Sequence, residues 1–247
     1  MRTSTRKVLD RSFSGLSLFS VLVMAASLLI ILGPLFVRGA GALVFKATVE
    51  HRKVLRDLFQ QGDPKALDDE IREVEAIRKP AFDLLLAFED DLRAMEPARR
   101  RVFLTPVKEV RTALRDLFGP LPGETKRMLV RDHFGEPRWD RARVDKLAKL
   151  LYREEYDYSD PTRAGVKVLR PRVETFRRTA LEPLFPYVEA HLAEMLLPRW
   201  TVYWGFLTNV SHDAHFFGGI WPELVGTFYL TLGAMVFAIP MGVIAAI

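Results

Sequence analysis

Two short stretches of the sequence hold residue types that carry chemistry, and the first is His-Asp-Ala-His at residues 212–215. Imidazole and carboxylate groups are ligands that zinc accepts. The two histidines are not spaced as in the His-x-x-x-His arrangement of a helical zinc site, and no fourth ligand is apparent. We therefore expect no metal site at His212, Asp213 and His215.

The second stretch is Arg-Glu-Glu-Tyr-Asp at residues 153–157, which supplies neighbouring carboxylates. Acid–base catalysis needs carboxyl groups that face one substrate, whereas adjacent residues on a helix point in different directions. We expect a solvated helix face here. Because the sequence also lacks a Gly-rich phosphate loop, a serine elbow and a kinase signature, it predicts no enzyme and no cofactor on this chain.

Composition narrows the class of protein further. The net charge is +5, yet Lys and Arg alternate with Asp and Glu through the middle of the chain, without a nucleic-acid-binding motif. We expect a solvated surface of mixed charge and no nucleic-acid partner. The chain has no cysteine, so any exported domain must be stabilised by packing alone.

An uncharged stretch near the N-terminus predicts a first transmembrane helix at residues 13–37. The basic residues Arg2, Arg6, Lys7 and Arg11 precede it, and the positive-inside rule places this flank, residues 1–12, in the cytoplasm. A cleaved signal peptide is the alternative, but its apolar region spans only about 7 to 15 residues.

A second uncharged run predicts a transmembrane helix at residues 224–247. About 24 helical residues at roughly 1.5 Å each are enough to cross a bilayer. No polar flank follows Ile247, so we expect the chain to be the first part of a longer protein. With two spans and the N-terminus inside, residues 38–223 would be periplasmic or extracellular, in a protein of the cytoplasmic (inner) membrane.

Apolar residues in the middle of the chain recur at helical spacing. Asp63 is placed to cap a helix whose first residue is Pro64, and Pro80 should kink that helix. A second series follows Pro97, which suggests an antiparallel, coiled-coil-like hairpin. The first series is Leu67, Ile71, Val74, Ala81, Leu85, Phe88, Leu92 and Met95, interrupted by Arg78, and the second is Phe103, Val107, Val110, Leu114 and Leu117.

Further helices are expected at residues 124–133, 140–156 and 173–197, and no sustained alternation supports a large sheet. The expected fold is all-α. It comprises two transmembrane helices that flank a helical extracytoplasmic insert at residues 38–199 and an irregular pre-membrane segment at 200–223.

Small residues recur every four positions along the second span, at Ala234, Ala238, Gly242 and Ala246. Such a stripe lets another membrane helix approach closely. We expect Pro240 to lie in this stripe and to bend the helix, which a multi-helix bundle can accommodate. A lone anchor would need neither feature.

The stretch from Trp204 to Ile247 resembles the start of the membrane core in permease subunits of bacterial phosphate ABC transporters, the A-type subunit in particular. Three elements carry the resemblance: Trp-x-Phe-Leu-Thr at residues 204–208, Gly-Gly-Ile at 218–220, and Gly-Thr followed by an apolar helix with Ala-x-Pro-x-Gly. The membrane helix-packing residues are then expected to be Gly226, Thr227, Ala234, Ala238, Pro240, Gly242 and Ala246.

The resemblance implies a membrane path for inorganic phosphate and several partners: a second permease subunit, two ATPase subunits that bind ATP, an extracytoplasmic phosphate-binding protein and membrane lipids. The resemblance covers about 44 residues, from Trp204 to Ile247. The long insert departs from the family pattern, and the phosphate-binding residues stay unknown because the later spans that line the path are absent.

Two other hypotheses for the function of the chain remain open. The first is a two-span sensor or receptor with a helical extracytoplasmic ligand-binding domain. It is disfavoured because Pro198, Asn209, Gly218, Gly219 and Pro222 interrupt any helix running into the second span. The second is an envelope scaffold without a transport role.

Overall fold

The computed structural model describes residues 3–124, 129–157, 165–213 and 216–246. The chain divides into two units, residues 1–44 and residues 45–247. The first unit consists of helix α1, Thr3–Leu43. It continues six residues beyond the predicted end at Val37, through Gly39 and Gly41.

The second unit ends in helix α9, Trp221–Ala246, which begins three residues before the predicted span. Pro222 suits this start because the first helical turn needs no backbone N–H donor. Among the described residues, two segments are long and apolar enough to cross a membrane: Gly15–Leu43, with mean hydropathy 2.5, and Trp221–Ala246, with mean hydropathy 2.0.

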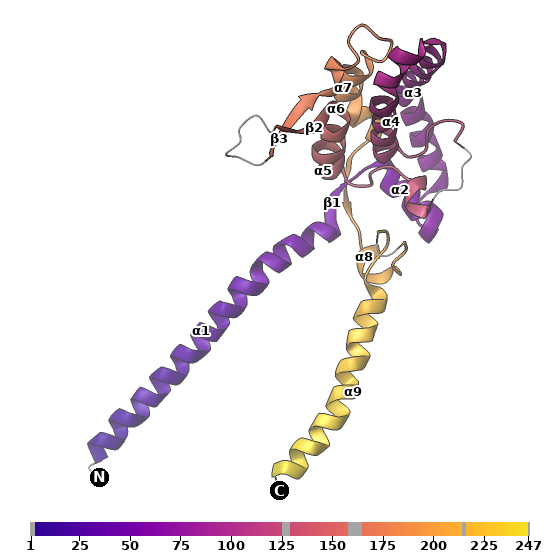
Figure 1. The fold of residues 1–247 in the computed structure, drawn as a ribbon. Coiled ribbons are helices and arrows are strands. Elements are labelled where there is room, and N and C mark those ends of the chain that lie inside the picture. The colour runs from indigo at the N-terminus through magenta and orange to yellow at the C-terminus, as the bar shows by residue number, and fades with distance from the viewer. Residues whose placement is uncertain (1–2, 125–128, 158–164, 214–215, 247) are drawn as a thin grey trace. The chain divides into compact units, whose positions relative to one another are not determined.

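The rest of the second unit is a mostly helical domain (Figure 1). Its main helices are α2 (Val49–Phe59), α3 (Pro64–Ala94), α4 (Pro97–Phe118) and α7 (Leu184–Leu196). As predicted, Asp63 caps α3: its Oδ1 accepts a hydrogen bond of 3.0 Å from the backbone N–H of Lys65.

The two apolar series predicted from the sequence supply much of the domain core. All five residues of the second series are buried on α4, and six of the eight in the first are buried on α3, in two separate clusters. Helix α7 contributes the facing wall of the main core, and four phenylalanine rings meet there with centroids about 5.6 to 6.0 Å apart. These rings belong to Phe88, Phe103, Phe176 and Phe185.

The predicted helix at 140–156 is wrong in its last part. Helix α5 (Trp139–Arg141), the π-helical turn η2 (Ala142–Lys146) and α6 (Leu147–Leu151) come first. Strand β2 (Tyr152–Asp157) then pairs antiparallel with β3 (Val166–Pro171). The carboxylates of residues 153–157 therefore lie on a strand, where Glu154 pairs with Lys167 and Glu155 with Arg170 across the two strands.

The predicted helix at 173–197 starts later than expected. A 3₁₀ turn, η3 (Arg172–Glu174), is followed by turns that include Arg178 at a φ of 59°, and α7 begins only after Pro183. Pro186 lies in the first turn of α7, where a missing N–H costs no hydrogen bond. Of residues 124–133, only the 3₁₀ helix η1 (Val130–His133) is helical among the described positions, and residues 125–128 lie outside them.

The segment expected to be irregular before the second span is more ordered than predicted. Strand β4 (Arg199–Val202) pairs with β1 (Val44–Ala47), and the short helix α8 (Gly205–Thr208) follows. Phe45 and Ala47 of β1 are buried, while Lys46 between them is exposed. This alternation gives the small sheet one face in the core and one face outside.

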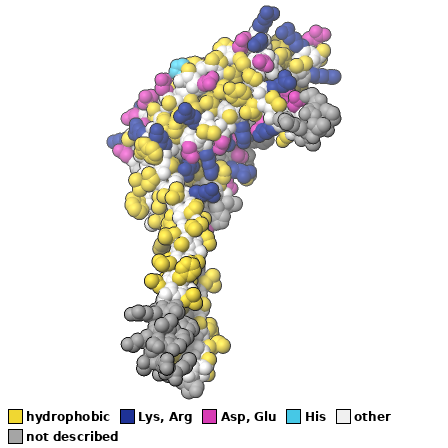
Figure 2. Space-filling model, turned by 90° about the vertical axis from the view of Figure 1, so that its left-hand side faces the viewer, with side chains coloured by type: hydrophobic (Ala, Val, Ile, Leu, Met, Phe, Trp, Pro, Cys, Tyr) yellow, Lys and Arg dark blue, Asp and Glu magenta, His cyan; other side chains and the backbone are white. Residues whose placement is uncertain are grey.

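The domain surface carries both signs of charge. Figure 2 shows Lys and Arg side chains interspersed with Asp and Glu on the visible face. Several of these charges are paired, such as Arg111 with Glu89 at 2.8 Å and with Glu124 at 2.9 Å. The mixed-charge surface expected from composition is present.

Candidate functional site

The residues predicted to pack in the membrane all lie on α9. Each of them is exposed, and no described side chain or backbone approaches within 4 Å of a Cβ built on Gly226 or Gly242. Thr227 is not a free hydroxyl, because its Oγ1 donates a hydrogen bond of 2.8 Å to the carbonyl of Glu223. The small residues of α9 are thus uncovered by the described part of the chain.

Pro240 does not belong to the stripe in which the sequence analysis placed it. Residues on a helix turn by about 100° each, so Pro240 lies on the side of α9 opposite to the row of Ala238 and Gly242. Helix α9 runs through Pro240 without interruption. Any bend at this proline would therefore open away from the small-residue row.

The Gly-Gly-Ile element at residues 218–220 is part of a tightly packed turn. A Cβ on Gly218 would come within 2.2 Å of the Val210 carbonyl oxygen, and one on Gly219 would come within 2.4 Å of the carbonyl oxygens of Gly205 and Phe206. The backbone N–H of Ile220 donates a hydrogen bond of 2.8 Å to Phe206. Glycine is thus required at 218 and 219 by backbone approach.

This turn is fixed to the helical domain through an aromatic cluster. Tyr203 lies edge-on to Phe45 and His51, with ring centroids 6.5 Å and 5.0 Å apart. The Tyr203 hydroxyl accepts a hydrogen bond of 3.1 Å from Nδ2 of Asn209, which is also buried. The pre-membrane segment is therefore anchored on β1 and α2.

The most buried charges of the domain are Glu50 on α2 and Arg78 on α3. Their Oε1 and Nη1 atoms are 2.8 Å apart. Arg78 also donates to the carbonyl of Met195, at 2.9 and 2.7 Å, and to that of Phe118, at 3.1 Å. Glu50 accepts a further hydrogen bond of 3.1 Å from the backbone N–H of Gly135.

This pair joins the ends of α4 and α7 to α2, so we call it the central ion pair. Burial raises the pKa of the Glu50 carboxyl, but the charges of Arg78 and Lys53 and the hydrogen bonds it accepts outweigh burial, and the pKa lies below its usual value. Nε, Nη1 and Nη2 of Arg78 all donate hydrogen bonds to protein acceptors. The pair is a structural element rather than a proton donor.

Sequence reasoning missed the central ion pair. The spacing of the apolar series marks Arg78 only as an interruption, and no pattern in the sequence singles out Glu50. The available signal was the position of Arg78 itself, since a charge on a core-facing position needs a buried partner. Nothing in the sequence identifies that partner as Glu50, 28 residues away.

Next to the pair, His51 is buried, and its Nε2 has no hydrogen-bond partner among the described residues. Burial, with smaller contributions from the charges of Arg52 and Arg138, lowers the pKa of His51 to about 4. The imidazole is therefore neutral near pH 7 and acts as an aromatic ring in its cluster with Phe45 and Tyr203.

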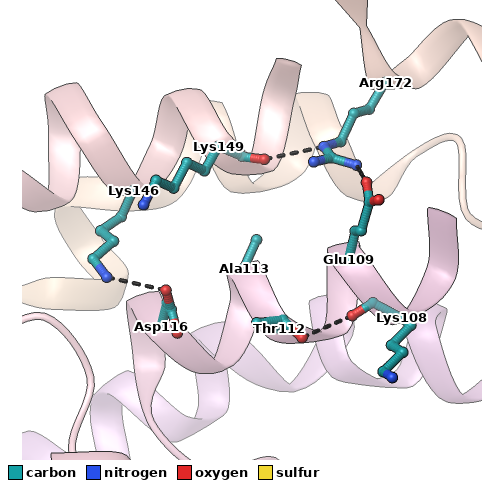
Figure 3. Close-up of a pocket in the computed structure, with 8 residues that line it drawn as sticks. All are labelled: Lys108, Glu109, Thr112, Ala113, Asp116, Lys146, Lys149 and Arg172. Carbon is teal, nitrogen blue, oxygen red and sulfur yellow. Dashed lines mark hydrogen bonds and ion pairs between the residues drawn. The ribbon is translucent and has the colours of Figure 1, made fainter. Parts of the chain in front are cut away.

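A groove of about 360 Å³ lies between α4 and α6 (Figure 3). Ion pairs cross it at both ends: Asp116 accepts from Lys146 at 3.0 Å, and Arg172 pairs with Glu109. Arg172 also donates to the carbonyls of Lys149 and Tyr152, at 3.0 and 3.1 Å. The groove is lined by Lys108, Glu109, Thr112, Ala113, Asp116, Lys146, Lys149 and Arg172.

The groove holds no arrangement for acid–base or nucleophilic catalysis. Its two carboxylates are paired with cations, and the Thr112 hydroxyl donates to the Lys108 carbonyl at 2.9 Å. Within the described part of the chain, no ion pair is found for the ammonium groups of Lys108 and Lys149. The contacts are those of a cross-link between α4, α6 and the turn after β3.

His212 and Asp213, the described residues of the stretch at 212–215, lie at a tight turn. His212 and Phe217 exchange backbone hydrogen bonds of 2.8 and 3.2 Å, and the Asp213 carboxylate accepts from the backbone N–H of Arg131 at 3.2 Å. The His212 ring packs edge-on against Phe59. His215 lies outside the described residues, and among those that are described no three His, Asp or Glu side chains gather as metal ligands.

Comparison of the chain with protein-family models, curated proteins and solved structures finds no match.

Proposed function

We propose that this chain is the N-terminal part of a permease subunit of a phosphate-importing ABC transporter. In this proposal α1 and α9 cross the cytoplasmic membrane, the helical domain lies on the periplasmic or extracellular side as an insert with a coiled-coil-like α3–α4 hairpin, and the basic N-terminus is cytoplasmic. The chain itself would be non-catalytic, and partner ATPase subunits would bind ATP.

The observation that carries the proposal is the bare surface of α9, which holds no charged residue after Glu223 in its first turn. Apart from Val225, which is half-buried, every described residue of α9 is exposed. Its row of Ala234, Ala238, Gly242 and Ala246 offers the close approach that helix–helix packing in lipid requires. A helix of this kind is suited to a membrane bundle, in which a second permease subunit would be one neighbour.

A second observation favours a permease over a two-span receptor. A receptor of that class passes its signal through a helix that continues into the second span. Here α7 ends at Leu196 and α9 begins at Trp221, with a strand, a short helix and tight glycine turns between them. The connection between α7 and α9 packs on the domain and is not a continuous helix.

The test compares the same substitution on two faces of α9. Gly242 and Gly233 are both exposed, and a Cβ on either would meet nothing within 4 Å. Nine residues turn the helix by about 900°, so the two glycines lie on opposite sides. We expect Gly242→Leu in the full-length protein to lower phosphate uptake by cells at least about fivefold, because it fills the small-residue row.

Gly233→Leu should leave uptake within about twofold of the unsubstituted protein. Co-purification of the second permease and the ATPase subunits with a tagged protein is the accompanying measurement, and only Gly242→Leu should reduce it. If deletion of the whole gene leaves phosphate uptake unchanged, the proposed role in phosphate transport is wrong.

A further inference from the structure

The outer face of the β1–β4 sheet carries Lys46, Trp200 and Val202, and two further exposed tryptophans lie in the segment that follows the sheet. The chain has four tryptophans, and Trp200, Trp204 and Trp221 lie within 22 positions of one another. They are 71%, 68% and 50% exposed, whereas Trp139 packs against the core. Buried tryptophan is the usual outcome in a folded domain, so three exposed ones in one region need a reason.

These residues lie on neighbouring elements. Trp200 and Val202 are exposed on β4, and the Lys46 ammonium on β1 lies 5.5 Å from the centre of the Trp200 ring. Trp204 immediately precedes α8, whose Phe206 carbonyl accepts the Ile220 N–H beside the start of α9. We call the set Lys46, Trp200, Val202, Trp204 and Trp221 the aromatic face.

Along the chain, Lys46 and Trp221 are close to the ends of the two candidate spans. Lys46 comes three residues after Leu43, the last residue of the first candidate span. Three residues reach at most about 11 Å. Trp221 comes three helical residues before Leu224, a rise of roughly 5 Å.

The rise of roughly 5 Å at Trp221 falls within the polar zone of a bilayer, and the reach of Lys46 overlaps that zone. That zone extends about 5 to 8 Å beyond the hydrocarbon on each side, and tryptophan is enriched there because its ring is apolar while its N–H is polar. Lysine beside a tryptophan adds a cation for lipid phosphates, with its stem along apolar surface. Exposed tryptophan, lysine and valine side chains on neighbouring elements are therefore the composition expected for contact with lipid headgroups.

We propose that the aromatic face rests in the headgroup region of a phospholipid bilayer, and so holds the helical domain against the membrane surface. The inference relies on the membrane spans of the proposed function but not on transport. A protein partner on this face, including a second copy of the chain, is the competing occupant.

The absence of cysteine from the chain makes site-specific labelling clean. We would place a nitroxide label on single-cysteine variants of the full chain in phospholipid nanodiscs and measure its collisions with oxygen, which concentrates in lipid, and with a water-soluble nickel complex. Val202→Cys reports on the aromatic face. Phe237→Cys in the middle of α9 and Val102→Cys on α4 are the lipid and water controls, and all three side chains are exposed.

Val102 is a suitable water control because its side chain is exposed near the start of α4. It lies 16 residues before Phe118, the end of α4 whose carbonyl accepts a hydrogen bond from Arg78 of the central ion pair. Along α4 this is about 24 Å. We expect the ratio of oxygen to nickel collisions for Val202→Cys to exceed that for Val102→Cys at least about threefold, and to stay below that for Phe237→Cys.

Equal ratios at Val202 and Val102, with a high ratio at Phe237, would overturn the headgroup contact and leave the membrane span intact. Loss of collisions with both reagents at Val202 would also overturn it, since protein and not lipid would then cover the face. A low ratio at Phe237 would show that α9 is not in the bilayer and would reject the proposed function as well. Circular dichroism of each labelled variant confirms that the helical content is retained.

Discussion

Nη1 of Arg78 lies 2.8 Å from Oε1 of Glu50, and both side chains are buried in the helical domain. The pair brings together α2, α3, the last carbonyl of α4 at Phe118 and the end of α7 at Met195. A cation with this many backbone acceptors fixes helix ends that would otherwise leave carbonyls unpaired. The domain therefore depends on the pair as a unit.

Arg78→Met should strongly destabilise the domain, because it leaves the buried Glu50 carboxylate with only the ammonium of Lys53, 3.1 Å away, as a cation. Removing one partner of a buried pair costs about 3 to 5 kcal/mol. For a domain of this size that lowers the melting temperature by roughly 10 °C. Thermal unfolding of the full chain in nanodiscs, followed by near-ultraviolet circular dichroism, measures the change.

The double variant Arg78→Met with Glu50→Gln is the control. Because it removes both charges, it should recover part of the lost stability. If the single and double variants melt at the same temperature, the pair is not coupled as described.

Acidification should destabilise the fold through His51. Its pKa is lowered to about 4 in the folded chain from 6.5, so between these values the unfolded chain binds more protons. Stability is therefore complete above about pH 6.5 and falls as the pH drops toward 4. The lowered pKa of Glu50 acts in the same direction below its ordinary value, as the carboxylate is protonated.

His51→Phe keeps an aromatic ring beside Phe45 and Tyr203 and removes the titration. We expect melting temperatures of this variant to change less between pH 7 and pH 5 than those of the unsubstituted chain. An identical slope in both proteins would show that His51 is not the titrating group.

Gly219→Ala should disrupt the turn before α9, because the new methyl group would meet the carbonyl oxygens of Gly205 and Phe206 at 2.4 Å. We expect a loss of about 2 to 4 kcal/mol and faster proteolysis between Tyr203 and Trp221. Gly226→Ala is the matched control, since nothing lies within 4 Å of its added Cβ. Equal proteolysis of the two variants would contradict the packing of this turn.

In the groove between α4 and α6, Arg172 and Lys149 are predicted to differ. Arg172→Ala removes one ion pair and two backbone hydrogen bonds and should lower stability by about 1 to 3 kcal/mol. Lys149→Ala keeps the backbone carbonyl that Arg172 uses, and should change stability by less than about 0.5 kcal/mol. A loss of activity from Lys149→Ala without a loss of stability would instead indicate a ligand in the groove.

The apolar pattern predicted the core of α3 and α4 because helical spacing reflects which face is buried. Phe103, Val107 and Val110 are buried as their spacing requires. Burial of Arg78 did not follow from the same rule, since a charge is assigned to the surface until its partner is known. That partner, Glu50, comes from another helix, and no local pattern connects the two.

The strand at Tyr152–Asp157 was missed for a related reason. Its residues are exposed or half-buried, so no strong apolar alternation marks it. What makes it a strand is pairing with Val166–Pro171, where valine alternates with lysine. In the pre-membrane turn, Gly218 and Gly219 could be recognised in the sequence, but their contacts with Val210 and Gly205 are set by the fold.

The pairing of β1 with β4 joins residues 44–47 to residues 199–202, so that about 150 residues of chain lie between the two strands. In a chain made from its N-terminus, β1 leaves the ribosome long before its partner. Helices α3 and α4 form from local contacts and can assemble first, whereas closure of the small sheet must wait until Val202 has been synthesised. Residues 203–220, which are made after Val202 and bring Phe217 against Val54 and Phe134, join the domain later still, so the part of the domain next to α9 is the last to be completed.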